Sequence, residues 1–407
     1  MNDNSFSFEY RPGAIHLGPN AVERINAELE TRGHSRALVV TGKNVGTTDA
    51  VMDPVRNGIG DACVGIFDDV TSNKYLRTAY EGAKRVRDEN VDALVAVGGG
   101  SSLDIAKHIC ALAGHDRPLD DVIEEILDSE RIVVPAESAE LVELFAVPTT
   151  LPGADLSQVA GITLAMDPEE KSRGEFPSTG VSDSRLMPAA VFYDLGLFST
   201  TPSHILARSA MNGFDKGIEM LYTRHNTPIT DGTATRGVRL LSEGLPALTD
   251  DSMTDAELST VLQGIVAVQY GLSTPNAYRA SVIHSFGHAI SRAYPVQQGV
   301  AHAVAAPHVL EYMFERIDGR RELLAEAFDV PTEGKTDEET AAAIVDAVAD
   351  VRDSLGLPSE LRSIEGTTPD DFPELAEAVI ADPFMREGPR DLTATADEIE
   401  TVFERMW

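Results

Sequence analysis

The chain has 407 residues, enough for two domains with complete hydrophobic cores. Its 43% hydrophobic and 24% charged residues are typical of a globular protein and exclude an intrinsically disordered one. The formal net charge of −33 disfavours nucleic acid as a partner, because the carboxylates would repel its phosphates.

The basic residues are strongly skewed, with 26 Arg and 7 Lys among the 33. Carboxylates hold a hydration shell well, whereas long lysine stems expose apolar surface. An acidic, lysine-poor surface therefore suits molar salt, which screens the self-repulsion, and it indicates the cytoplasm of a halophilic archaeon. The alternative, an acidic face for a basic partner protein, is disfavoured because the acids are spread along the whole chain.

The cysteines and the N-terminal segment indicate a cytoplasmic protein. Only Cys63 and Cys110 occur, without a C-x-x-C spacing, so two reduced thiols are expected. The first residues, MNDNSFSFEY, lack the basic region and the apolar core of a signal peptide. No apolar run approaches the length of a membrane span, so we expect no membrane partner.

The N-terminal half alternates short apolar runs with amphipathic stretches, the pattern of a parallel sheet flanked by helices. Residues 5–17 alternate apolar and polar side chains around Arg11-Pro12-Gly13, which predicts a hairpin at a sheet edge. The predicted helices are 21–32 and 76–90, and the further predicted strands are 36–41, 64–67, 93–97, 144–147, 159–164 and 189–192.

The stretch 92–107, DALVAVGGGSSLDIAK, carries the strongest local signal. Its five apolar residues suit a strand buried on both faces, and Gly98, Gly99 and Gly100 then turn the backbone tightly. Ser101 precedes Asp104 by three residues, the spacing of a capping box at the start of a helix. Strand, turn and helix together aim free backbone N–H groups at one point, which predicts a phosphate site. The alternative is a tight turn that binds nothing.

Other turns follow predicted strands at the same edge of the sheet. Gly42, Asp69 and Thr149–Thr150 all lie at carboxyl ends of strands, where parallel sheets bind their ligands. From about residue 202 onward, helical periodicity replaces the strands, and the predicted helices are 205–223, 232–245, 256–272, 276–294, 300–317 and 339–355. We therefore expect a nucleotide-binding α/β domain over residues 1–200 and an all-helical domain over residues 201–407.

Five segments together resemble the iron-containing alcohol dehydrogenase family, which also includes glycerol dehydrogenase, dehydroquinate synthase and maleylacetate reductase. The resemblance implies a Rossmann-like N-terminal domain, a helical catalytic C-terminal domain and catalysis in the cleft between them. The segments are VAVGGGSSLDIAK (95–107), AVPTT (146–150), LMPAAVFYD (186–194), HSFGHAI (284–290) and QGVAHAVAAPHV (298–309).

The resemblance also implies which residues bind the cofactor. The backbone of the glycine turn would hold the pyrophosphate, Thr149 and Thr150 would line the adenosine and phosphate side, and Leu186 would pack near the nicotinamide ribose. The complete implied set is Gly42, Lys43, Gly98, Gly99, Gly100, Ser101, Asp104, Thr149, Thr150 and Leu186.

The residues after the first buried strand favour NADP(H) over NAD(H). Many NAD-using relatives carry an acid there, which binds a ribose 2′-hydroxyl and repels a 2′-phosphate. This chain has Gly42, which leaves room, and Lys43, which supplies positive charge. The alternative is that Lys43 is an ordinary surface lysine.

The metal-binding positions of the family are substituted in this chain. The family binds a divalent metal through one Asp and three His, and the resemblance places Asn212, Lys216, His284 and Gln298 at these positions. An ammonium group cannot replace a metal ligand, so we predict no tightly bound iron or zinc. Asp215 is expected to point about 100° away from that helix face. Maleylacetate reductase offers a precedent, with Asn at the Asp position and a His that matches His302.

Without a metal, other groups must stabilise the charge that builds on a carbonyl oxygen during reduction. We hypothesise that Lys216, with its pKa lowered in the cleft, supplies the cation and the proton. His284 would assist, and His288 lies one helical turn along as an orienter or relay. His302 and His308 can be site residues or packing histidines.

The sequence thus favours an NAD(P)-dependent oxidoreductase that interconverts a small alcohol and its aldehyde or ketone. Lys216, Arg208 and Arg292 suit an anionic substrate, and relatives of this type are homodimers or larger assemblies. Two alternatives stay open: a catalytically inactive NAD(P)-binding homologue, and a lyase of the dehydroquinate synthase type.

Overall fold

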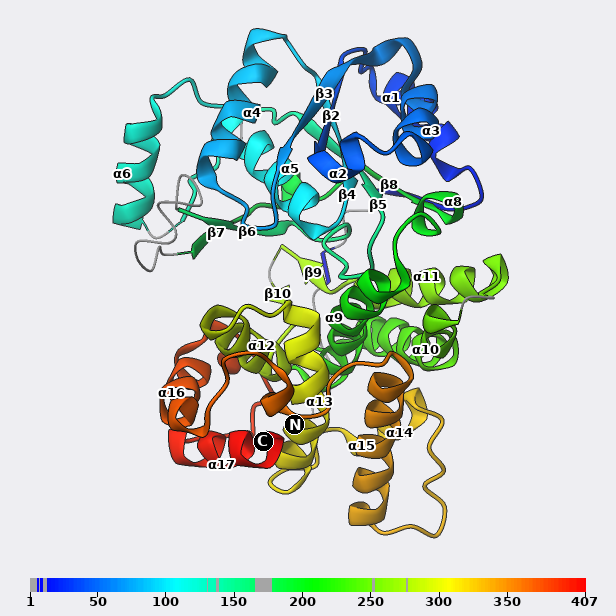
Figure 1. The fold of residues 1–407 in the computed structure, drawn as a ribbon, viewed down its shortest axis with the longest axis vertical. Coiled ribbons are helices and arrows are strands. Elements are labelled where there is room, and N and C mark those ends of the chain that lie inside the picture. The colour runs from blue at the N-terminus through cyan, green and yellow to red at the C-terminus, as the bar shows by residue number, and fades with distance from the viewer. Residues whose placement is uncertain are drawn as a thin grey trace. The chain divides into compact units, whose positions relative to one another are not determined.

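The computed structural model describes the chain except residues 1–5, 7, 10–12, 130, 137–138, 165–177, 251–252 and 276. Its contacts divide the chain into two compact units. One unit spans Glu9–Thr201 and contains the large sheet, and the other spans Pro202–Trp407 together with the residues before Glu9. We call them the sheet unit and the helical unit (Figure 1). In the described part of the chain, no helix is both long enough and apolar enough to cross a membrane.

The sheet unit contains six parallel strands in the order β1-β8-β5-β4-β2-β3 and a separate antiparallel pair, β6 and β7. The predicted parallel α/β architecture is therefore confirmed. The elements described are β1 (Ala14–Gly18), η1 (Ala21–Arg24), α1 (Ile25–Arg32), β2 (Ala37–Gly42), α2 (Lys43–Gly46), α3 (Asp49–Ile59), η2 (Gly60–Ala62), β3 (Cys63–Val70), α4 (Leu76–Asp88), β4 (Ala93–Gly98), α5 (Gly100–Ala113), α6 (Leu119–Ser129), β5 (Glu143–Pro148), β6 (Val159–Thr163), β7 (Ser178–Ser182), η3 (Ser184–Leu186), β8 (Ala190–Asp194) and α8 (Leu195–Phe198).

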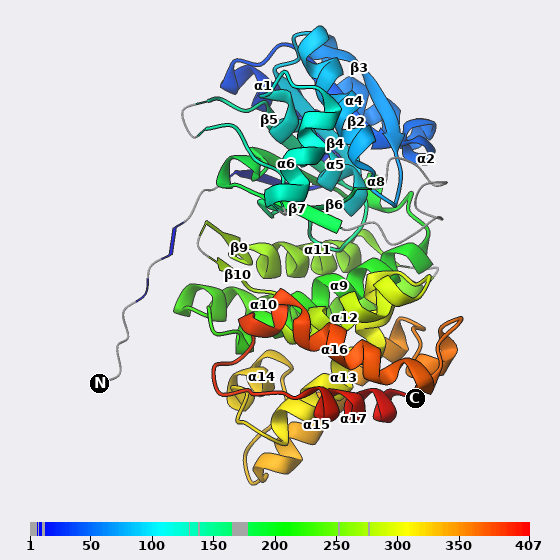
Figure 2. The same cartoon turned by 90° about the vertical axis from the view of Figure 1, so that its left-hand side faces the viewer.

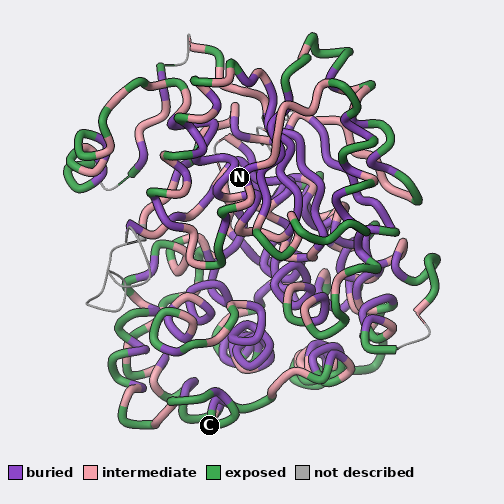
Figure 3. Tube along the Cα trace, turned by 45° about the horizontal axis from the view of Figure 1, so that its top comes forward, coloured by how far each residue is buried: buried purple, intermediate pink, exposed green. Residues whose placement is uncertain are grey.

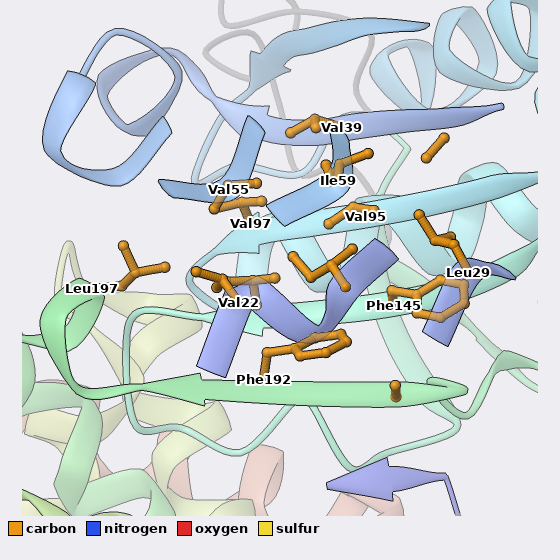
Figure 4. Close-up of a cluster of buried hydrophobic side chains, with 14 of the residues drawn as sticks. Val22, Leu29, Val39, Val55, Ile59, Val95, Val97, Phe145, Phe192 and Leu197 are labelled. Atoms are coloured by element: carbon orange, nitrogen blue, oxygen red, sulfur yellow. The ribbon is translucent and has the colours of Figure 1, made fainter. Parts of the chain in front are cut away.

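Helices cover both faces of the six-stranded sheet, with α4 and α5 on one face and α1 and α3 on the other (Figures 1 and 2). Val39, Val95 and Val97 pack with side chains of α1 and α3 in one hydrophobic cluster (Figure 4). Their neighbours Leu38 and Leu94 point to the opposite face and are equally inaccessible. Burial of each such side chain contributes about 1.5–3 kcal/mol, so an apolar run without alternation correctly predicted a strand buried on both faces.

The first predicted hairpin is not what the described residues form. β1 lies at the sheet edge, as expected, but it pairs in parallel with β8 in the register Ala14 to Ala190. The tip of the proposed hairpin, residues 10–12, lies outside the described residues. Period-2 alternation identifies a half-buried edge strand but not its partner, and here the partner is more than 170 residues away, as the pairing Ala14 to Ala190 shows.

The predicted capping box is wrong. The helix α5 begins at Gly100 with Gly99 as its N-cap, so Ser101 already lies inside the first turn and no side chain caps the helix. Asp104 instead accepts a hydrogen bond from the Lys74 ammonium at 2.9 Å. The glycine turn itself ends the strand and starts the helix, which leaves no position for a separate cap.

The helical unit contains mainly helices and one very short hairpin, β9–β10. The predicted helix 276–294 therefore begins later than expected, because β10 occupies its start and α12 begins only at Val282. The elements described are α9 (Ser203–Tyr222), α10 (Pro228–Gly244), η4 (Leu245–Thr249), α11 (Asp255–Gln269), β9 (Ser273–Thr274), β10 (Ala277–Tyr278), α12 (Val282–Ala293), α13 (Gln298–Phe314), α14 (Arg321–Ala327), α15 (Asp337–Ser354), η5 (Leu361–Ser363), η6 (Pro369–Asp371), α16 (Phe372–Ala381), η7 (Pro383–Glu387) and α17 (Ala396–Met406).

Two helices, α9 and α13, form the interior of the helical unit. Both are buried on nearly all sides over most of their length, as the chain coloured by burial illustrates (Figure 3). They contact each other, and α12 contacts α13 and, less extensively, α9. A polar side chain on α9 or α13 therefore needs a partner within the protein.

A buried lysine fixes the segment that follows Thr149 and Thr150, the two residues after β5. The Lys107 side chain on α5 is completely inaccessible, and its ammonium donates to the carbonyl oxygens of Ala154 at 2.7 Å and Val159 at 3.3 Å. The stem of this lysine packs inside the unit while its charge is solvated by backbone carbonyls.

We predict that Lys107→Met lowers the free energy of unfolding by about 2 kcal/mol, because two carbonyl groups lose a charged donor. Lys84→Met is the matched control, since Lys84 is exposed on α4 and its replacement changes the net charge equally. Denaturant unfolding in molar KCl measures both variants. Equal midpoints for Lys107→Met and Lys84→Met would contradict the prediction.

Candidate functional site

The glycine turn after β4 presents a free helix start. Gly98 has a φ of +127°, which only glycine adopts readily, and its carbonyl accepts the Thr149 N–H at 3.0 Å. Gly99 is extended, and α5 then begins without a side-chain cap. The first N–H groups of this 14-residue helix have no partner within the helix and lie at the positive end of its dipole. This arrangement suits a phosphate group.

The strand order places this turn where parallel sheets bind ligands. The chain passes from β2 outward to β3, and from β4 in the opposite direction to β5. A crevice forms at such a reversal, between the carboxyl ends of the two strands. Gly42 ends β2 and Gly98 ends β4, so both glycines predicted from the sequence lie at this reversal.

Several of the other residues predicted for the cofactor lie close to the same turn. Val45 of α2 approaches Gly98, since a Cβ on Gly98 would lie 3.8 Å from a Val45 methyl. Lys43 opens this short helix and is exposed. A Cβ on Gly99 would lie 3.1 Å from the Thr150 hydroxyl, so the turns after β4 and β5 touch. Leu186 is completely buried, in an element that contacts α5 and β5.

An acidic residue that the sequence reading did not single out lies at the same edge. Asp68 lies near the carboxyl end of β3 and next to α2, where a Cβ on Gly46 would lie 3.7 Å from its carboxylate. Its side chain is partly buried. The only signal in the sequence was the pair Asp68-Asp69 after a predicted strand.

A second group of polar residues lies inside the helical unit. Asn212, Asp215, Lys216 and Glu219 lie on α9 at spacings of three and four residues, which brings them close to one face of the helix. All four are buried, with exposures of 7%, 0%, 6% and 0%. Asn212, Asp215 and Glu219 have neighbours on α12 and α13. A further histidine of α12, His288, contacts the segment after α16.

Glu219 binds His284 through both carboxylate oxygens. Oε1 accepts the backbone N–H of His284 at 3.1 Å, and Oε2 lies 2.5 Å from the ring Nδ1. Burial raises the pKa of Glu219 to about 7, although backbone N–H groups at the start of α12 oppose the rise. Burial, followed by the charge of Lys216, lowers the pKa of His284 well below its usual value. The neutral imidazole is therefore the form present at pH 7.

Asp215 faces His302, contrary to the expectation that it points away from the cluster. Its Oδ2 lies 2.9 Å from Nδ1 of His302, and both side chains are completely inaccessible. Burial raises the pKa of Asp215 and lowers that of His302, so we assign both as neutral and not as an ion pair. Asn212 and Asp215 are about one turn apart on α9, and their neighbours Gln298 and His302 are about one turn apart on α13. The two helices can therefore form both contacts side by side.

His288 is oriented by an acid from a distant segment. Its Nδ1 lies 3.0 Å from the Asp382 carboxylate, and Arg292 donates to the same oxygen at 3.3 Å. The ring of His288 is partly exposed and lies 6.3 Å from that of His284, measured between centroids. The structure thus gives each of the three histidines, His284, His288 and His302, a carboxylate neighbour.

The two amides predicted at former ligand positions bind each other. Asn212 donates from Nδ2 to Oε1 of Gln298 at 3.2 Å. Lys216 is buried one helical turn away, and its charge lowers the pKa of both His284 and His302, after the effect of burial. The structure therefore brings Asn212, Lys216, His284 and Gln298 into one region of the helical unit.

Several other predicted residues lie outside this cluster. Arg208 is exposed, and Arg292 is mostly exposed and bound to Asp382. His308 is partly buried, and burial lowers its pKa, but it makes no contact with the other histidines described here. The cluster thus consists of the α9 polar face, His284 with its neighbour His288, and the first turns of α13.

Comparison with known families identifies the chain. Residues 12–195 match the family described as iron-containing alcohol dehydrogenase, and residues 206–407 match the C-terminal part of the same family. The chain belongs to the iron-containing alcohol dehydrogenase family. It is 26% identical over 398 residues to lactaldehyde reductase of Escherichia coli, which covers 96% of this chain and 97% of that protein.

Other members of the iron-containing alcohol dehydrogenase family show the same overall match. The chain is 24% identical to maleylacetate reductase 1 of Rhodococcus opacus, over 99% of this chain and 97% of that protein. The structure of an alcohol dehydrogenase from Oenococcus oeni superposes with a TM-score of 0.85 at 20% identity, covering 98% of this chain and all of that one. The relatives are dehydrogenases and reductases, so the chain belongs to a family of alcohol and aldehyde oxidoreductases.

The name of the family implies a metal, and the side chains present do not fit one. In the described ranges, no group of three or more His, Cys, Asp or Glu side chains is arranged to hold a metal ion. An amide pair and a lysine occupy three of the four positions that the sequence aligns with metal ligands, and an ammonium repels a metal cation. The alignment of these four positions stays a prediction.

Sequence reasoning missed the acids that contact the histidines. Glu219 and Asp215 had a signal, because both interrupt an otherwise apolar stretch of α9. Asp382 had none, since 94 residues separate it from His288.

We predict that His302→Asn reduces the loss of stability on acidification. The pKa of His302 is depressed in the folded state, so its stabilising contribution is complete above the unfolded value of about 6.5 and is lost as the pH falls below it. Between pH 7.0 and 5.5 this loss amounts to about 1 kcal/mol. Denaturant unfolding at both values measures it, with the exposed His204→Asn as control. An unchanged pH dependence in His302→Asn would show that folding does not lower the pKa of His302.

Proposed function

We propose that this family member is an NADP(H)-dependent oxidoreductase that interconverts a small alcohol and its aldehyde or ketone without a catalytic metal. The observation that carries the proposal is the uncapped start of α5 at the strand reversal, in a family whose relatives are dehydrogenases and reductases. The backbone N–H groups after Gly99 would hold the diphosphate of the dinucleotide. When bound, the nicotinamide supplies or accepts the hydride.

The preference for the phosphorylated cofactor rests on Gly42 and Lys43. Gly42 presents no side chain against a 2′-phosphate, and Lys43 begins α2 with an exposed ammonium group. Asp68 acts against this preference, because its carboxylate lies near α2, 3.7 Å from the position of a Cβ on Gly46. The proposal requires that the exposed Lys43 ammonium contacts the 2′-phosphate, since a direct ion pair outweighs a partly buried carboxylate that does not contact it.

The buried cluster of the helical unit supplies the groups that a carbonyl oxygen needs during reduction. Negative charge grows on that oxygen, and a fixed cation in a site of low dielectric stabilises it without reorganisation. Lys216 is the cation, in the region where relatives are expected to bind a metal. His284, neutral at pH 7, offers a ring nitrogen that can accept the hydroxyl proton when the alcohol is oxidised, and His288 with Asp382 gives a second imidazole that is partly exposed.

The substrate that fits is a small polar carbonyl compound. The relatives include enzymes named for lactaldehyde, 1,3-propanediol and maleylacetate. Lys216 favours an anionic member of this group, whereas Arg292 is already bound to Asp382 and contributes less. Lys216 and Gln298 at the family's ligand positions support equally the alternative of a cofactor-binding protein without activity.

Assays with purified protein in molar KCl separate these functions. Steady oxidation of NADPH with a panel of small aldehydes and keto acids, in protein whose metal content is negligible by mass spectrometry, supports the proposal. Tight NADPH binding without turnover across the panel favours the inactive homologue. A product released without net consumption of the cofactor favours a lyase of the dehydroquinate synthase type.

We predict that Lys216→Met lowers kcat by at least about a hundredfold, because the developing oxyanion loses its cation. NADPH affinity, followed by fluorescence, stays within about twofold because the glycine turn is unchanged. Lys335→Met, at an exposed lysine in the loop before α15, is the charge-matched control. Retained turnover in Lys216→Met would exclude Lys216 from the chemistry.

We predict that Gly42→Asp weakens NADPH binding at least about tenfold and improves the relative use of NADH. At about 4 Å in water, two like charges repel by about 1 kcal/mol, and a 2′-phosphate carries nearly two charges. Gly42→Ala is the steric control, since a Cβ there would lie 3.1 Å from the Val70 carbonyl oxygen. Equal effects of the two variants on NADPH would attribute the change to crowding and not to charge.

A further inference from the structure

We propose that Glu219 is a positioning residue that fixes the ring of His284 in one tautomer, with the proton on Nδ1 and the lone pair on Nε2. The inference rests on the proposed function, in which His284 assists the chemistry at the substrate oxygen. In this proposal, Glu219 determines which ring nitrogen of His284 is free to accept a proton.

The two carboxylate oxygens of Glu219 have separate donors. Oε1 accepts the backbone N–H of His284 at 3.1 Å, and the hydroxyl group of Tyr222 lies 3.4 Å from the same oxygen. Oε2 lies 2.5 Å from His284 Nδ1. A carboxylate only accepts hydrogen bonds, so the nitrogen that faces it must carry the proton.

Backbone N–H groups at the start of α12 favour the carboxylate form of Glu219 against the effect of burial, and this form predominates above its pKa of about 7. Ser281 precedes this helix and gives it no side-chain cap. The N–H groups of Ser281, Ile283 and His284 instead contact the carboxylate from α9. The Glu219 side chain thus caps α12 and also binds the ring of His284 in the first turn of that helix. The orientation of the ring is therefore fixed relative to the helix axis.

The other ring nitrogen of His284, Nε2, is buried and accepts or donates no hydrogen bond in the described structure. Nε2 of His284 has no hydrogen-bond partner among the residues that the structure describes, and the side chain is almost completely inaccessible. The ring of His302 lies 4.3 Å away, measured between centroids, and limits rotation of the imidazole. With the proton on Nδ1, Nε2 presents a lone pair that can accept the hydroxyl proton of an alcohol.

A glutamine at position 219 would reverse this assignment. An amide has one accepting oxygen and one donating nitrogen, so it cannot accept from both the backbone N–H and the ring N–H. The backbone donor cannot change, whereas the imidazole can shift its proton from Nδ1 to Nε2. Glu219→Gln therefore places a donor on the side of the ring that is open in the parent protein.

The experiment compares ring ¹⁵N spectra and kinetics of the parent protein, Glu219→Gln and a matched control. Spectra are recorded at pH 8.5, above the pKa of about 7 for Glu219, and the His284 signals are identified by their loss in His284→Gln. The control is Glu28→Gln in the sheet unit, where Glu28 contacts the ring of His16 at 2.9 Å. We expect a protonated Nδ1 in the parent protein and a protonated Nε2 in Glu219→Gln.

Kinetics then show whether Glu219 positions His284 for the reaction or only caps α12. We expect kcat for alcohol oxidation with NADP⁺ to fall about a hundredfold in Glu219→Gln, because Nε2 can no longer accept the hydroxyl proton, with the KM for NADP⁺ unchanged and Glu28→Gln equal to the parent protein. A protonated Nε2 in the parent protein overturns the proposal without any variant. A reversed tautomer with unchanged kcat overturns the positioning role. Failure of the parent protein to oxidise NADPH overturns the proposed function, while the ring spectra still decide the tautomer.

Discussion

Removal of ionisable side chains from water is the constraint on which the interior of the helical unit depends. Asp215, Lys216 and Glu219 lie on α9, a helix buried on nearly all sides, where an uncompensated charge is costly. Glu219 and Asp215 are each placed against an imidazole, and burial shifts the pKa values of these groups toward their neutral forms. The register of α9 against α12 and α13 must satisfy these contacts together, so the polar cluster restricts how the three helices pack.

The candidate site of the sheet unit is formed by backbone N–H groups, whereas that of the helical unit is formed by side chains. Gly98 allows a conformation that other residues adopt at a cost, and the helix that follows starts without a cap. Asp104, which the sequence suggested as part of that cap, binds Lys74 instead. The N–H groups of the first turn therefore stay available for an anion, and the strand order locates them at the reversal between β2 and β4.

In our proposal, a lysine ammonium replaces the divalent cation as the positive charge near the substrate oxygen. Relatives in this family are expected to hold a divalent cation by an Asp and three His, whereas this chain offers an amide pair, one histidine and Lys216. A lysine is a single charge on a flexible stem and needs a dry environment to act on a substrate oxygen. Lys216 is buried, and the acids near it on α9, Asp215 and Glu219, are completely inaccessible.

The sequence alone determined the strands buried on both faces, the glycine turn, the change from an α/β to a helical half and the family. These features depend on periodicity and on glycine conformations that neighbouring residues specify. The partner of β1, the start of α12 and the acids beside the histidines were decided only by the tertiary structure. Glu219 contacts His284 across 65 residues and Asp382 contacts His288 across 94. Which buried acid meets which imidazole depends on the packing of whole helices, and local sequence does not encode that packing.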